Sequence, residues 1–187
     1  MGIDPGSRQT GWAVIDVAKG RAQHVASGAL NLGAGALAER LKKIFLELQQ
    51  LVQQYQPTEF AVEQAFVSRN ADSALKLGQA RGAAICVAAV ADLPVAEYAP
   101  RAVKQSVAGT GAASKQQIQA MVSALLDLPL ADLQADQADA LAVALTHMNY
   151  RTLGPLLDSA GKAQLRKGRA GKRTRGRAAW RAFGANL

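Results

Sequence analysis

Four acidic side chains occupy positions in this sequence where a charge is energetically expensive. Asp4 ends a short apolar segment and opens an Asp-Pro-Gly-Ser turn, and Glu63 follows the apolar run of residues 60–62. Asp136 and Asp139 lie at the start of an alanine- and leucine-rich stretch. A carboxylate near a core is destabilising unless something compensates it. Four of them indicate oxygen ligands for divalent cations, and hence metal-assisted chemistry at phosphate.

Each acid taken alone also has a purely structural interpretation. Asp136 and Asp139 are three residues apart and share one helical face, but the helix dipole also favours acids in a first turn. Asp4 fits an ordinary turn between two strands, and Glu63 fits a strand that emerges into water. The metal-site hypothesis therefore depends on all four side chains converging in the fold.

The order of the expected elements favours an α/β domain. After the short apolar start, strands are predicted near residues 11–17, 24–30, 59–63 and 94–98. Apolar spacing predicts helices near residues 36–55, 71–91, 102–107, 114–126 and 135–150. Three strands followed by alternating helices and strands predict a mixed sheet flanked by helices. We expect one domain over residues 1–151 and a basic, disordered tail over residues 152–187.

The basic charge is concentrated in that tail. The whole chain has a net charge of +8, yet residues 162–187 contain nine basic residues and no acidic one. A segment rich in glycine and arginine predicts an arm that attracts nucleic acid without choosing a sequence. The alternative is a solubilising extension with no binding role.

Other features narrow the class of protein. The sequence has no apolar run long enough to span a bilayer and no leader pattern, so a cytoplasmic protein without membrane contact is expected. The single cysteine, Cys86, lies in an apolar stretch and is expected to pack. Neither histidine is a candidate for catalysis, since His24 is expected on a strand surface and His147 is expected to be structural. No arrangement that supports covalent catalysis is evident.

The basic residues between Glu63 and Asp136 form a second group, which is suited to binding phosphate. Several of its members fall near expected helix starts or loops, where backbone N–H groups also meet phosphates. Phe66, just after Glu63, could stack on an unpaired base or simply cover the core. Any single member could equally be a solubilising residue. The basic residues between Glu63 and Asp136 are Arg69, Lys76, Arg81, Arg101, Lys104 and Lys115.

Five motifs occur in order along the chain, and they are Gly2–Ser7, Val62–Phe66, Asn70–Gly82, Val103–Gln105 and Asp136–Ala142. Together they resemble the RuvC family of bacterial Holliday junction resolvases. The resemblance covers residues 2 to about 150. It implies an RNase H-like fold, a homodimer and two-metal endonuclease chemistry. The family's first strand usually begins several apolar residues earlier, so here this strand is either very short or preceded by residues upstream of Met1.

The resemblance also implies roles for individual residues. Phe66 matches the family's base-stacking aromatic, and Lys104 and Lys115 match its DNA-contacting lysines; Arg69, Lys76 and Arg81 are further candidates for DNA binding. The implied substrate is a four-way DNA junction cut on two symmetric strands, and the implied partner is a branch-migration motor of the RuvA and RuvB type. The implied catalytic tetrad is Asp4, Glu63, Asp136 and Asp139. It would hold two Mg²⁺ ions per subunit, with Mn²⁺ as a substitute.

Two other classes of function match part of the sequence. The Asp4-x-Gly6 turn followed by Thr10-Gly11 resembles the first phosphate loop of the sugar-kinase and actin superfamily. Those phosphotransferases need a duplicated domain with a second phosphate loop. The other alternative is a non-catalytic nucleic-acid-binding relative of the same fold, which the presence of all four acids disfavours.

Deletion of residues 162–187 tests the role of the basic tail. We expect weaker binding to a four-way junction and a smaller dependence of binding on salt, because fewer cationic side chains displace counterions from the DNA. Cleavage by the bound protein should remain intact. Dissociation constants of the full and truncated chains, measured over a range of salt concentrations, provide the check, and an unchanged salt dependence would refute the binding role.

Overall fold

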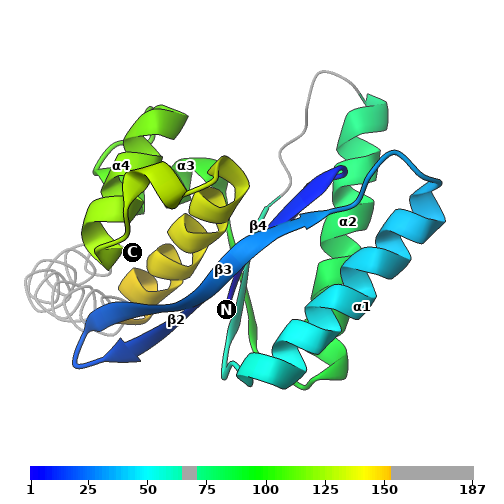
Figure 1. Cartoon of the computed structure of the whole chain (residues 1–187), viewed down its shortest axis with the longest axis horizontal. Coiled ribbons are helices and arrows are strands. Elements are labelled where there is room, and N and C mark those ends of the chain that lie inside the picture. The colour runs from blue at the N-terminus through cyan, green and yellow to red at the C-terminus, as the bar shows by residue number, and fades with distance from the viewer. Residues whose placement is uncertain (65–70, 153–187) are drawn as a thin grey trace, which may run out of the picture. The chain divides into compact units, whose positions relative to one another are not determined.

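The computed structural model describes residues 1–64 and 71–152. One mixed sheet has the strand order β3-β2-β1-β4-β5. β1, β2 and β3 form an antiparallel meander, and β4 and β5 extend the sheet in parallel beyond β1 (Figure 1). The bounds of the strands are β1 Gly2–Asp4, β2 Gln9–Ala18, β3 Arg21–Asn31, β4 Phe60–Glu63 and β5 Val95–Tyr98.

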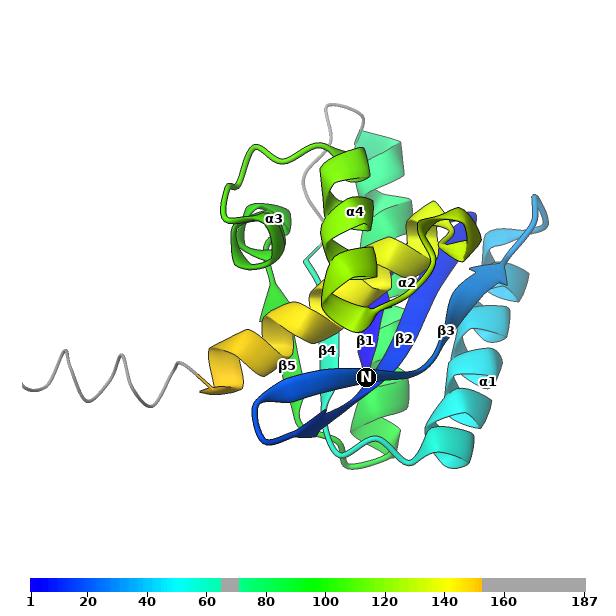
Figure 2. The same cartoon turned by 60° about the vertical axis from the view of Figure 1, so that its left-hand side comes forward.

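Helices cover both faces of this sheet, as Figures 1 and 2 show. α1 and α2 lie on one face, and α3, α4 and the helix of residues 135–152 lie on the other. This arrangement confirms the predicted mixed α/β sheet. In the described part of the chain, no helix is both long and apolar enough to cross a membrane. The remaining bounds are α1 Leu37–Tyr55, α2 Ala71–Val90, α3 Pro100–Ala108, α4 Lys115–Leu126 and the 3-10 turn η1 Leu130–Asp132.

The predicted elements differ from the observed ones mainly at their ends. β2 and β3 run several residues further than expected, because Lys19 and Gly20 adopt positive φ and allow a tight hairpin turn between them. β1 contains only 3 residues. Cys86 is exposed on α2, so the packing role expected for it is not observed within this chain. The division into a domain and a tail stays a prediction, because residues 153–187 lie outside the described ranges.

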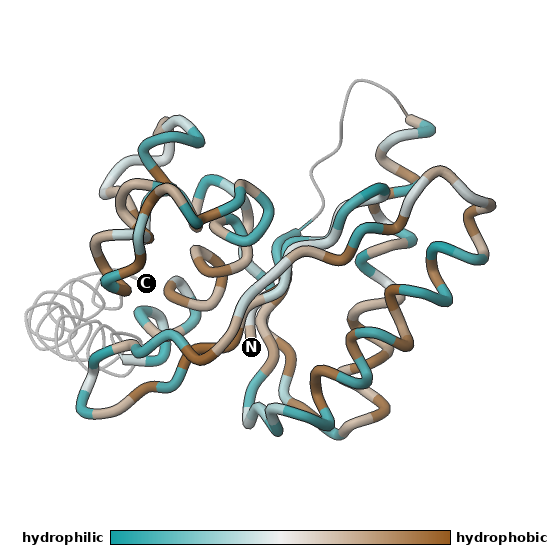
Figure 3. The backbone as a smooth tube through the Cα atoms, in the orientation of Figure 1, coloured by the Kyte–Doolittle hydropathy of each residue, from teal (hydrophilic) through white to brown (hydrophobic). Residues whose placement is uncertain are grey.

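The face that carries α1 and α2 is built from large apolar side chains. Ile3 and Phe60 from the sheet are fully buried against Ile44 and Leu48 of α1. These helical residues are spaced by four, so they lie on one side of α1, and the hydropathy colours of Figure 3 alternate along this helix accordingly. α1 ends at Gln56, which adopts a left-handed conformation. This side of the sheet supplies ordinary hydrophobic stabilisation.

The opposite face uses small residues, which allow a helix to approach closely. A Cβ atom at Gly2 would lie 2.5 Å from the carbonyl oxygen of Ala140, and one at Gly11 would lie 2.0 Å from that of Asp136. Only glycine fits at these contacts, since both neighbours are backbone atoms of the helix of residues 135–152. The first turn of that helix is therefore held directly over the pair formed by β1 and β2.

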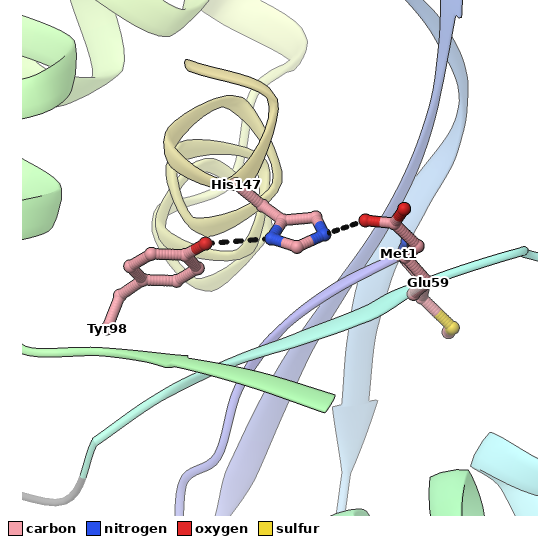
Figure 4. Close-up of polar contacts among 4 residues, drawn as sticks. All are labelled: Met1, Glu59, Tyr98 and His147. Carbon is pink, nitrogen blue, oxygen red and sulfur yellow. Dashed lines mark hydrogen bonds and ion pairs between the residues drawn. The ribbon is translucent and has the colours of Figure 1, made fainter. Parts of the chain in front are cut away.

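A polar network fixes the other half of the same helix, as Figure 4 shows. Nδ1 of His147 shares a hydrogen bond with the Tyr98 hydroxyl at 2.8 Å. Nε2 of the same ring lies 2.5 Å from the Glu59 carboxylate. The backbone nitrogen of Met1 donates to the carbonyl oxygen of Glu59 at 2.8 Å. These contacts join the helix to β5 and to the residue that precedes β4. The structural role expected for His147 is thus confirmed.

Candidate metal and active site

Two of the four acids come from the ends of neighbouring parallel strands. β1 pairs with β4 in parallel, with Gly2 opposite Ala61 and Ile3 opposite Val62. Asp4 and Glu63 are the next residues along each strand and so reach the same edge of the sheet. Side chains alternate between the faces of a strand. Asp4 and Glu63 therefore face the same side as Gly2 and Ala61, which is the side that carries the helix of residues 135–152.

The turn after Asp4 is held by polar contacts to its backbone. Gly6 leaves no room for a side chain, because a Cβ atom there would lie 1.9 Å from the carbonyl oxygen of Gln9. The fully buried Thr10 donates its hydroxyl to the carbonyl of Gly6 at 3.1 Å. Arg40 of α1 donates to the carbonyl of Ser7 at 2.5 Å. These contacts restrict the direction in which the chain leaves Asp4.

The other two acids join Asp4 from the helix. Carboxylate oxygens of Asp4, Asp136 and Asp139 all lie within 4.8 Å of one another. Glu63 shares a side-chain hydrogen bond with Asp4. The predicted spatial convergence is therefore observed for all four side chains, whereas the catalytic roles assigned to them stay predictions. An all-oxygen cluster of this size is the kind of site that hard divalent cations prefer.

Burial and mutual repulsion make these carboxyls hold protons unusually well. Burial and, to a smaller extent, the nearby charge of Asp139 together raise the pKa of Asp4 to about 6. The pKa of Glu63 is raised to about 8, first by burial and then by the charge of Asp4. Because the two groups share a hydrogen bond, the proton belongs to the pair. At neutral pH the cation-free site therefore retains a proton that bound cations would have to displace.

Lys115 compensates part of this negative charge. Its Nζ lies 3.1 Å from Oδ2 of Asp139, and this contact raises the pKa of the ammonium group. Lys115 is the first residue of α4, which begins with a capping box between Ser114 and Gln117. The cap fixes where α4 starts and hence where Lys115 enters the site.

A pocket of about 370 Å³ opens beside the acids. Asp4, Glu63 and Asp139 line it, together with Lys104 of α3 and Lys115. Asp136 is not among the lining residues, although its carboxylate belongs to the acidic cluster. The remaining wall is mostly apolar and is formed by residues such as Leu77, Pro100, Val103, Ile118 and Ala142. The pocket thus combines carboxylates, two ammonium groups and an apolar wall.

The other candidate DNA-binding residues are not gathered at this pocket. On α2, Lys76 pairs with Asp72 at 2.5 Å, and Arg81 pairs with Glu97 of β5. Phe66 and Arg69 lie outside the described residues. The proposed DNA contacts of all these side chains, and of Lys104 and Lys115, stay predictions.

The sequence did not indicate the contacts of some residues that shape the site. Arg40 and Thr10 hold the turn after Asp4 from different elements. Arg40 belongs to no recognised motif, and Thr10 stood out only through the likeness to a kinase phosphate loop. Gln137, between the two aspartates, donates to Ser27 of β3 at 2.7 Å. Gln137 lies within the motif of residues 136–142, but that motif did not predict its contact with Ser27. Arg40 contacts Ser7 across 33 residues of sequence.

Comparison with solved structures defines the class of protein. The yeast mitochondrial Holliday junction resolvase aligns with a TM-score of 0.63 at 12% identity, covering 81% of this chain and 78% of that one, and so shares the fold. RuvC from T. thermophilus, solved in complex with a Holliday junction substrate, aligns with a TM-score of 0.76 at 35% identity, covering 82% of this chain and 94% of that one. The RNase H-like fold expected from the sequence is thereby confirmed.

Sequence comparison then gives the family. The family model described as crossover junction endodeoxyribonuclease RuvC matches residues 1–147. The protein of that name from Shewanella amazonensis is 53% identical over 167 residues, covering 89% of this chain and 94% of the relative. The one from Saccharophagus degradans is 51% identical over 170 residues, covering 90% and 96%. The chain belongs to the RuvC family of crossover junction endodeoxyribonucleases, which sets aside the phosphotransferase and non-catalytic alternatives.

The raised pKa values of the acids predict how stability depends on pH. A carboxyl whose pKa is higher in the folded than in the unfolded protein stabilises the fold fully below its ordinary pKa, and this contribution is lost as pH rises through the raised value. The cation-free protein should therefore lose stability between about pH 4 and pH 8. The double variant Asp4→Asn/Glu63→Gln should lose less over this range and melt several degrees higher at pH 8.

Thermal unfolding in EDTA at pH 5 and pH 8 measures this effect. The exposed acid Asp132 provides a control, because Asp132→Asn removes a charge without touching the cluster. If the double variant and the wild type lost the same stability between the two pH values, the two carboxyls would not share the retained proton.

Proposed function

We propose that this protein is a metal-dependent endonuclease that resolves four-way DNA junctions by two symmetric cuts during recombination and DNA repair. Membership of the RuvC family supports the reaction and the substrate. The observation that carries the proposal is the convergence of Asp4, Asp136 and Asp139 beside Glu63, at the edge of a pocket that also contains two lysines. Acids and lysines at one pocket suit a reaction at phosphate.

The four acids would hold the cations. Their oxygens suit Mg²⁺, which takes few protein carboxylates and completes its shell with water and substrate oxygens. We propose two Mg²⁺ ions per subunit, replaceable by Mn²⁺. Such ions activate the attacking water and stabilise the leaving 3′ oxygen. The raised pKa values of Asp4 and Glu63 support this assignment, since they reflect buried negative charge that a cation would compensate.

The lysines of the pocket would act on the substrate rather than on the cations. Lys115 and Lys104 both line the pocket, so their ammonium groups can offset the charge that develops on the phosphate. Lys76 and Arg81 are partnered by Asp72 and Glu97, so their contacts to DNA would require these ion pairs to be exchanged. The proposal also includes Phe66 for base stacking and Arg69 for backbone binding.

A cleavage assay on a synthetic four-way junction tests the proposal. With Mg²⁺, the wild type should nick two symmetric strands and leave a linear duplex of the same sequence uncut. Asp4→Asn and Asp139→Asn should each lower the cleavage rate by at least about 100-fold, since losing a ligand costs more than losing an outer-shell partner. Junction binding should be retained, because it depends on phosphate contacts.

The exposed variant Asp132→Asn serves as the control and should cut like the wild type. Full turnover by Asp139→Asn would contradict the site assignment. Absence of cleavage by the wild type with either Mg²⁺ or Mn²⁺ would contradict the proposed reaction.

We also propose that α2 contributes to a homodimer interface. Its buried side is formed by Ala80, Ala84, Val87 and Ala88. The other side exposes Leu75 at 63% and Val90 at 66%, with Gly78, Gly82 and Cys86 between them at spacings of three or four residues. An apolar helix face with small residues allows a second helix to pack closely. A two-fold dimer would place two equivalent sites on a two-fold-symmetric junction.

Introducing a charge at the centre of this face tests the dimer. A Cβ atom at Gly82 meets nothing within 4 Å, so Gly82→Glu should leave the fold of one subunit intact. We expect the wild type to sediment as a dimer at micromolar concentration and Gly82→Glu to sediment as a monomer, because the interface would bury an unpaired charge. Gln53→Glu, on the exposed side of α1, is the matched control. A monomeric wild type would refute the interface.

The cellular setting follows from the resemblance to the family. We propose that the protein works in the cytoplasm beside a branch-migration motor of the RuvA and RuvB type. The motor would move the junction, and the nuclease would cut once a preferred short sequence reached its two sites.

A further inference from the structure

Gln137 stands between two of the clustered acids and makes two contacts of its own. Its side-chain amide nitrogen donates to Oγ of Ser27 on β3 at 2.7 Å, across 110 residues of sequence. Its amide oxygen accepts from the backbone nitrogen of Gln134 at 3.2 Å, just before the helix begins. One side chain thus links the first turn of the helix of residues 135–152 both to its own start and to the sheet.

Ser27 is itself held in place. It pairs with Ala13 in the sheet, and its Oγ lies 2.7 Å from Nε2 of His24. Burial lowers the pKa of His24, so the neutral ring can accept the hydroxyl proton of Ser27. The oxygen of Ser27 then remains available to the amide of Gln137. The sheet therefore presents an oriented acceptor rather than a freely rotating hydroxyl.

The glycine contacts set the distance of this helix from the sheet, and side-chain contacts restrain its rotation. Gly2 and Gly11 let the helix backbone approach the sheet closely. His147 restrains the second half of the helix, and Gln137 makes the corresponding contact in the first turn.

Rotation about the helix axis would move Asp136 and Asp139 away from Asp4. Residues advance by about 100° in an α-helix, so Gln137 and Asp139 point in nearly opposite directions. Contacts at both positions would resist rotation from both sides.

On the Asp139 side, the restraint is a contact that catalysis would disturb. Asp139 is held by Lys115 at 3.1 Å, yet the proposed function assigns Asp139 to a cation and Lys115 to the substrate phosphate. The Gln137–Ser27 hydrogen bond involves neither role. It can therefore persist while the pair of Asp139 and Lys115 is exchanged.

We propose that Gln137 is a positioning residue, which through Ser27 fixes the rotation of the helix and thereby aligns Asp136 and Asp139 for cation binding. This inference rests on the proposed metal site. It adds that the hydrogen bond to Ser27 of β3 holds the helix that carries two of the acids. It predicts that Gln137 changes the affinity of the site for cations without touching them.

Binding of Mn²⁺ alone to the full chain, measured by calorimetry without DNA, tests this role. Gln137→Ala and Ser27→Ala should each weaken Mn²⁺ binding by about 10-fold, the lower end for loss of an outer-shell partner. The double variant should be no weaker than Gln137→Ala, because each single change already removes the hydrogen bond between Gln137 and Ser27. Ser27→Thr keeps the hydroxyl and should retain the wild-type affinity. Gln53→Ala on α1 is the matched control.

The outcomes separate this inference from the function on which it rests. Wild-type affinity in Gln137→Ala, or losses that add in the double variant, would overturn the positioning role while leaving the metal site intact. A wild type that binds no Mn²⁺ would overturn both. A purely structural role would lower the melting temperature of the variants in EDTA and leave their Mn²⁺ affinity unchanged, which would also overturn the proposal.

Discussion

The close contact between the helix of residues 135–152 and the sheet is the constraint on which the site depends. A helix usually packs on a sheet through two layers of side chains, at about 10 Å. Here Gly2 and Gly11 remove one layer, so helix backbone meets strand backbone. Aspartate has a short side chain, and only this approach lets Asp136 and Asp139 reach Asp4. The glycines thus matter for the site although they carry no chemistry.

The two faces of the sheet divide stability from function. Ile3, Phe60, Ile44 and Leu48 fill one face with large buried side chains, and their hydrophobic stabilisation is ordinary. The other face buries several acids together, and burial followed by mutual repulsion raises the pKa of Asp4 and Glu63 and destabilises the fold at high pH. A site that is strained without its cations gains most from binding them, since binding relieves the repulsion. The first face supplies the stability that the second face requires.

The sequence predicted the elements and the four acids, but not the contacts that align them. Strand and helix periodicity is local, so the order of elements followed from it, and acids at strand ends stood out against apolar neighbours. The Lys115–Asp139 pair, the Gln137–Ser27 bond and the His147 network join elements that are far apart in the chain. Such contacts depend on register and on the approach of helices, which periodicity does not encode. The packing expected for Cys86 is not observed within this chain for a related reason, because α2 is apolar on more than one side.

The pairing of Lys115 with Asp139 connects the electrostatics of the resting site to its proposed reaction. A free ammonium beside a substrate pocket would bind anions at random, whereas Lys115 is neutralised by Asp139 while the site lacks cations. If a cation offset the charge of Asp139, the attraction between Asp139 and Lys115 would weaken, and Lys115 could contact a phosphate. Its long, flexible side chain suits this exchange. Cation binding and substrate binding would then favour each other, because each relieves a charge that the other leaves unpaired.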